Sequence, residues 1–159
     1  MDFSIKRDRL LGDSVLIMGL GIERRTGFLQ ATLSVLGPFL HELGFRCVRA
    51  DPIIVRYESD SMFCVICRDW RDYSIDVSIG TLPYQKSLHE YSMYEIMKSL
   101  NIPWFEHAAR DAPEVRARVE QLTDLLRKHC EDLLKGDAEA IRGFDEKARR
   151  VRDANPYNQ

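Results

Sequence analysis

The chain lacks an apolar run that could cross a membrane: no uninterrupted stretch approaches the roughly 18 residues that a membrane helix requires. It also lacks a basic excess, because 23 Lys and Arg stand against 25 Asp and Glu, and this balance argues against nucleic acid as a partner. The apolar run at Val15–Met18 is too short for the core of a signal peptide. We therefore expect a cytoplasmic protein with no membrane partner.

Cysteine is sparse, and its positions do not suit a disulfide scaffold or a metal site. Cys64 and Cys67 have the spacing of a redox or zinc motif, but residues three apart in a strand project to opposite faces of a sheet. No second cysteine pair or histidine pair completes a ligand set. We expect neither a metal nor another cofactor, and four free, structural thiols at Cys47, Cys64, Cys67 and Cys130.

No recognisable catalytic motif is present. The sequence has no Gly-x-Ser-x-Gly element, and its four histidines are scattered. The segment Val15–Gly21 superficially looks like the glycine turn of a dinucleotide fold, but Arg24 occupies the third glycine position. We therefore name no catalytic residue.

The first regular element is an amphipathic helix. From Phe28 to Leu43 the apolar residues recur three and four positions apart, which predicts one buried stripe. Thr26 is a suitable N-cap, and Gly44 suits the position just past the end of the helix. Pro38 lacks an amide hydrogen, so we expect a kink near Gly37.

Strand-like segments follow this helix. Ile53–Glu58 and Tyr73–Gly80 alternate apolar and polar residues, and Phe45–Ala50 is a shorter candidate. Met62–Cys67 is apolar at every position, so it should be a central strand with both sides covered. The cover could be the C-terminal helices, the N-terminal segment or a second subunit. This order predicts an antiparallel meander of three or four strands.

The C-terminal part is predicted to be helical. After a linker at 81–90, we expect three helices, with N-caps at Ser92, Asp111 and Asp137. The long middle helix, over 112–135, should present Val119, Leu122 and Leu126 to the sheet. The prediction is an α+β fold: one domain over 26–159 in which an amphipathic helix packs on the sheet, with residues 1–25 as an N-terminal extension.

Two joints carry a resemblance to a known group. The run from Leu36 to Phe45 (Leu-Gly-Pro-Phe-Leu-His-Glu-Leu-Gly-Phe) and the run Leu133–Asp137 (Leu-Leu-Lys-Gly-Asp) resemble helix ends of small uncharacterised bacterial α+β domains. Some of those domains are suspected toxin-immunity proteins. The resemblance implies a binding role, and its motifs include no catalytic residue.

Charge suggests where a partner would bind. Residues 51–111, which include all the predicted strands except Phe45–Ala50, carry six basic and ten acidic side chains, a net charge of −4. Arg56, Glu58 and Asp76 should share the sheet, with Trp70 at its rim, and we predict these four as partner-binding residues. Such a surface suits a basic protein partner, because complementary charge accelerates encounter.

The functional hypothesis is a cytoplasmic protein-interaction module of immunity-like or adaptor type. A dimeric protein similar to a secretion chaperone is one alternative. A small hydrolase that uses Asp69, Asp72 or Asp76 near the sheet is the other.

Overall fold

The computed structural model describes residues 21, 25–85, 88–105 and 107–155. The predicted N-terminal extension, 1–25, lies outside the described residues except at Gly21 and Arg25, both of which are helical. In the part of the chain that is described, no helix combines the length and hydropathy needed to span a bilayer.

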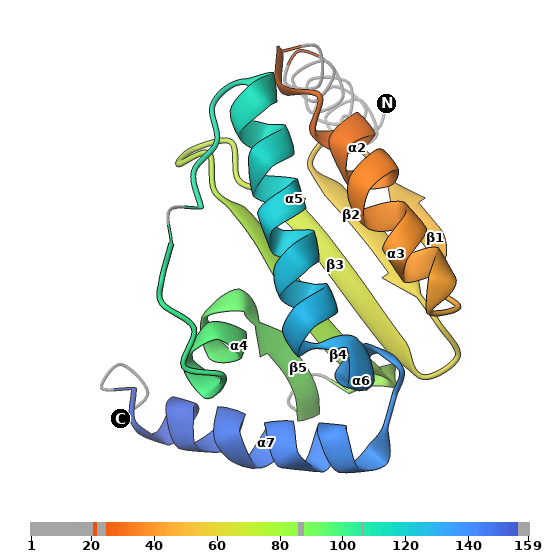
Figure 1. Ribbon diagram of the computed structural model, residues 1–159, viewed down its shortest axis with the longest axis vertical. Helices are drawn as coiled ribbons and strands as arrows, with labels where there is room; N and C mark the ends of the chain where they lie inside the picture. The colour runs from red at the N-terminus through yellow and green to blue at the C-terminus, as the bar shows by residue number, and fades with distance from the viewer. Residues whose placement is uncertain (1–20, 22–24, 86–87, 106, 156–159) are drawn as a thin grey trace, which may run out of the picture.

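The fold is α+β, as predicted, and is built on a five-stranded antiparallel sheet with its strands in chain order (Figure 1). The sequence predicts three or four strands, and the extra one comes from the region expected to be a linker. That region instead forms the end of β4 and most of β5, with register partners Gly80 and Glu90. The strands are β1 (Arg46–Ala50), β2 (Ile54–Glu58), β3 (Met62–Arg68), β4 (Ile75–Gln85) and β5 (Leu88–Ser92).

The helices gather on one side of the sheet (Figure 1). The N-terminal helical run and α5 cross this side next to each other, while α7 crosses below them and packs on α4. The helical elements are α2 (Phe28–Ala31), η1 (Thr32–Leu36), α3 (Gly37–Glu42), α4 (Met93–Ser99), α5 (Ala112–His129), α6 (Glu131–Leu134) and α7 (Ala138–Asp153). The predicted long helix over 112–135 is thus divided at Cys130 into α5 and α6.

The first helix contains the irregularity that Pro38 predicts. The turn before Pro38, η1, is a π-helix. Its hydrogen bonds join residues five apart, and this wider turn accommodates a residue that has no amide hydrogen. The side chain of Tyr57 packs closely against Gly37. A Cβ at this position would lie 2.9 Å from Tyr57 Oη, so glycine is favoured here. The predicted N-cap was wrong: Thr26 is buried, and Gly27, with φ 58°, holds the cap position.

Helix ends elsewhere follow the predicted chemistry. The side chains of Ser92, Asp111 and Asp137 each accept a hydrogen bond from a backbone N–H in the first turn of their helix. Gly44, with φ 84°, ends α3 in a Schellman motif, in which Phe45 N–H donates to the Leu40 carbonyl at 3.0 Å.

The core lies between the helices and one face of the sheet. The central strand contributes Met62, Cys64 and Ile66 to it, all with no exposed surface. From the helical side, the predicted stripe of α5 is buried as expected at Val119, Leu122 and Leu126. This face of the sheet is therefore covered by the helices of the same chain.

Replacing Leu122 by Ala should lower the free energy of unfolding by about 2–5 kcal/mol, because the side chain is buried and would leave a cavity. The exposed neighbour Asp124 is the matched control, and its replacement by Ala should change stability by no more than about 0.5 kcal/mol. Urea denaturation of both variants gives the comparison. A loss below about 1 kcal/mol for Leu122→Ala would contradict its place in the core.

Two glycines should respond in opposite directions to alanine. Gly136 has φ 76°, and a Cβ there would lie 2.5 Å from Ser61 Oγ, so Gly136→Ala should destabilise by at least about 1–2 kcal/mol. Gly143 lies inside α7 with no atom within 4 Å of its Cβ position, so Gly143→Ala should stabilise by about 0.5–1 kcal/mol. Thermal unfolding of both variants measures these changes in stability. A change of the same sign and size in the two variants would contradict the assigned backbone conformations.

Candidate functional site

The second face of the sheet is the main surface that the described helices leave uncovered (Figure 1). Its residues follow from strand register, since Glu58 pairs with Phe63 and Arg56 with Val65, alternating with the buried Tyr57 and Val55. We call this surface the open face. Its members are Arg46 and Arg49 of β1; Ile54, Arg56 and Glu58 of β2; Phe63, Val65 and Cys67 of β3; Asp76, Ser78 and Gly80 of β4; and Glu90 and Ser92 of β5.

This arrangement changes the expectation for the central strand. One side of β3 is fully buried under helices, but of its residues on the open face only Phe63 is buried, and Val65 and Cys67 are partly exposed. Among the described residues, no helix supplies the second cover that an entirely apolar strand predicts.

Three of the four predicted partner-binding residues lie on the open face. Arg56 Nε is 2.7 Å from Glu58 Oε1, and the Arg56 guanidinium lies 4.4 Å from the centre of the Phe63 ring. Asp76 is on the same face, two strands away from Arg56. Trp70 is 58% exposed in the turn between β3 and β4, beyond the last paired residues, so it is not a core residue.

Sequence reasoning missed most of the other members of the open face. Val65 was expected to be fully covered, and Glu90 was expected in a linker. Alternation within 73–80 does place Ser78 on the same face as Asp76, but nothing local shows that β1 and β5 extend this face at both edges.

The turn carboxylates proposed for hydrolysis have structural partners. The backbone N–H of Arg71 donates to Asp69 Oδ1 at 2.7 Å and lowers the pKa of that carboxyl. The backbone N–H of Ser74 does the same for Asp72 at 2.9 Å. Both carboxylates therefore stabilise the β3–β4 turn. In the described part of the chain, no three His, Cys, Asp or Glu side chains gather closely enough to hold a metal ion.

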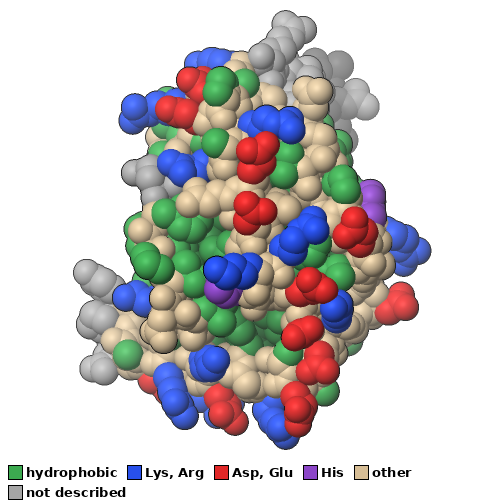
Figure 2. All heavy atoms as spheres, in the orientation of Figure 1, with side chains coloured by type: hydrophobic (Ala, Val, Ile, Leu, Met, Phe, Trp, Pro, Cys, Tyr) green, Lys and Arg blue, Asp and Glu red, His purple; other side chains and the backbone are tan. Residues whose placement is uncertain are grey.

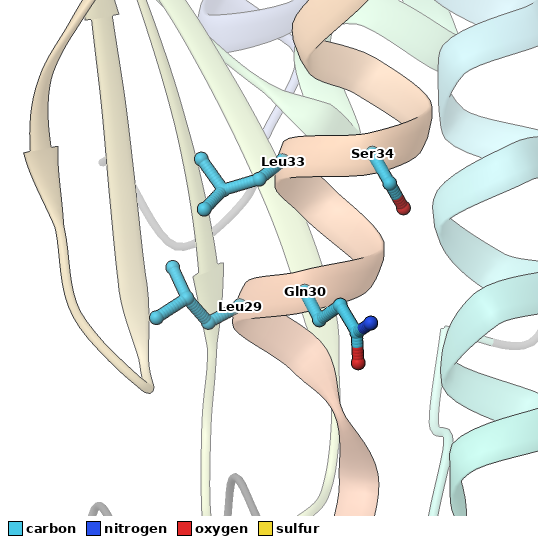
Figure 3. Close-up of a pocket in the computed structure, with 4 residues that line it drawn as sticks. All are labelled: Leu29, Gln30, Leu33 and Ser34. Atoms are coloured by element: carbon cyan, nitrogen blue, oxygen red, sulfur yellow. The ribbon is translucent and has the colours of Figure 1, made fainter.

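Two surface depressions lie away from the predicted residues. One, of about 480 Å³, is lined by Leu29, Gln30, Leu33 and Ser34, with the two leucines pointing to one side of the helix and the polar pair to the other, toward α5 (Figure 3). None of these four described residues carries an ionisable side chain. The other, of about 300 Å³, lies at the start of α5 and is lined by Ala108, Arg110, Glu114, Ala117 and Arg118.

An aromatic cluster in the loop before α5 was not predicted. Trp104 is 61% exposed and stacks with a tilt on His107, with ring centres 4.3 Å apart. His107 is itself buried and packs on Phe105 at 4.5 Å. On this helical side of the molecule, acidic and basic side chains are interspersed and form no large patch of one sign (Figure 2).

The cysteines occupy the opposite faces that their spacing predicts. Cys64 lies in the core, whereas Cys67 lies on the open face, and all four thiols are free. Burial raises the pKa of Cys64 and that of Cys130 to about 12. Burial, and next the charge of Asp76, raises the pKa of Cys67.

Comparisons of the chain with models of protein families, with curated proteins and with solved structures find no match.

The thiols should label in the order of their exposure. With a maleimide at neutral pH, we expect the exposed Cys47 to react first, because Cys64 and Cys130 are buried and protonated well above pH 7. Mass spectrometry of labelled peptides distinguishes the four sites. Labelling of Cys64 in the folded protein as fast as Cys47, or a native disulfide between Cys64 and Cys67, would contradict this assignment.

Proposed function

We propose that this chain is a protein-interaction module of immunity-like or adaptor type that binds its partner through the open face. The observation that carries the proposal is the central strand. Its apolar residues Val65 and Cys67 lie partly exposed on a sheet face that no described helix covers. A sheet face of this kind gains stability when another surface removes its apolar side chains from water.

The chemistry of the face matches that of a protein interface. Partly buried apolar side chains lie in the middle, at Ile54, Val65 and Cys67, and charged side chains lie toward both edges. Interfaces have this distribution, with an apolar centre and a polar rim. Trp70 would add an aromatic anchor at the end of the sheet.

The charges refine the expected partner. The acidic excess of 51–111 does not concentrate on the open face, where three arginines balance three carboxylates. Asp76 and Glu90 lie toward β4 and β5, whereas Arg46 and Arg49 lie on β1. The basic groups of a partner would therefore lie over β4 and β5, and its acidic groups would lie over β1.

The free thiols support the proposed location. All four cysteines are free, including Cys47, which is exposed. Exposed free thiols suit a reducing compartment, and we propose the cytoplasm as the site of action.

A photo-crosslinking amino acid placed at Ser78, in the middle of β4 on the open face, tests the proposal in cells that express the chain. We expect a discrete covalent adduct with another polypeptide, because Ser78 would lie inside the interface. The same amino acid at Glu139, an exposed position on α7, is the control and should give no such adduct. Absence of any adduct from Ser78, or equal adducts from both positions, would overturn the proposal.

A further inference from the structure

The open face has a size and charge pattern that complements itself. Across the sheet, the bulky side chains of Arg56 and Glu58 on β2 share rows with the small residues Ser78 and Gly80 on β4. The charge also changes sign from β1 to β5, because Arg46 lies on the first edge strand and Glu90 on the other. The middle of the face, on β3, is apolar.

Strand register places the relevant residues in level rows. One row runs from Arg46 through Glu58, Phe63 and Gly80 to Glu90, because each residue is the register partner of the next. The neighbouring row includes Arg56, Val65, Ser78 and Ser92. These two rows therefore begin with large or basic side chains and end with small or acidic ones, while the third row runs from Ile54 through Cys67 to Asp76.

A second copy of the chain can use this pattern in one orientation. If a two-fold axis runs parallel to β3 between two facing sheets, β2 of one copy lies over β4 of the other, and β1 lies over β5. Arg56 then faces Ser78, Arg46 faces Glu90, and Glu58 lies over the buried Gly80, so in these two rows large side chains meet small ones and opposite charges meet. Stacked sheets about 10 Å apart accommodate such interdigitated side chains.

The other face-to-face two-fold arrangement brings like charges together. An axis perpendicular to the strands would lay β1 on β1, with Arg46 and Arg49 opposite the same residues of the second copy. Like charges in direct opposition are unfavourable. The charge pattern thus favours the axis parallel to β3 over the axis perpendicular to the strands.

We infer that the partner of the open face is a second copy of this chain, stacked sheet on sheet with β1 of each copy over β5 of the other. This inference rests on the proposed function of the open face and names its partner. The contact is isologous, as in most symmetric dimers, since both copies use the same surface.

A charge exchange between Arg46 and Glu90 tests the inference. The wild-type chain should sediment at about twice its 18.5 kDa mass. Arg46→Glu and Glu90→Arg should each weaken the dimer at least about tenfold, because each variant places like charges opposite each other twice. An equimolar mixture of the two variants, and the double variant R46E/E90R, should both recover the dimer.

The exposed Arg149 of α7 provides the matched control, since Arg149→Glu makes the same charge change away from the open face and should leave the dimer intact. Far-ultraviolet circular dichroism confirms that each variant is folded. A wild-type chain that stays monomeric up to about 1 mM would overturn the inference. So would variants whose weakened association is not recovered on mixing, which would exclude the pairing of β1 with β5.

The Ser78 crosslink separates failure of the inference from failure of the proposed function, and it needs no destabilising substitution. An adduct of twice the mass of the chain supports the second copy. An adduct of any other mass overturns the homodimer but retains the interaction module, and absence of an adduct overturns both.

Discussion

The fold depends on one packing constraint: the described helices of the chain all pack on the same face of the sheet. The strict alternation of β2, β3 and β4 sends residues such as Val55, Ile66 and Val77 to this face. A slip of register by one residue would move all of them to the other side. The same alternation leaves the open face with a mixed set of apolar and charged residues, so the core and the candidate interface arise from one sequence pattern.

A second constraint fixes the far edge of the sheet. Arg152 of α7 donates to the Glu90 carbonyl at 2.6 Å and pairs with Glu95 of α4, while Tyr91 Oη donates to Asp145 of α7. Burial and the hydrogen bond to Asp145 raise the pKa of Tyr91, which therefore stays a donor. These contacts attach the last helix to β5, and they hold β5 in place as one border of the open face.

The sequence was sufficient for features that depend on local patterns. The first helix, the strands through Gly80 and the caps at Ser92, Asp111 and Asp137 all follow from periodicity and side-chain chemistry within a few residues. Features that depend on distant pairing could not be found in this way. Arg152 and Glu95 are 57 positions apart, and β5 is specified by its pairing with β4 more than by its own composition.

In the candidate site, too, local patterns could be predicted and distant pairings could not. Alternation groups Arg56 with Glu58 because they are neighbours on one strand, but the row that joins Arg46 to Glu90 exists only once four strand pairings are known. The full cover expected for Met62–Cys67 is present only in part among the described residues, since Phe63 on the open face is 1% exposed but Val65 and Cys67 are partly buried. An apolar strand sequence shows that both faces favour burial, and it does not show whether the same chain supplies both covers.

The contacts within the open face are compatible with a surface that changes on binding. Arg56 covers the Phe63 ring, which is 1% exposed, and pairs with Glu58 at the same time. Both side chains of this ion pair are partly exposed, and pairs of that kind contribute only about 0–1 kcal/mol. The ion pair therefore adds little to the stability of the fold.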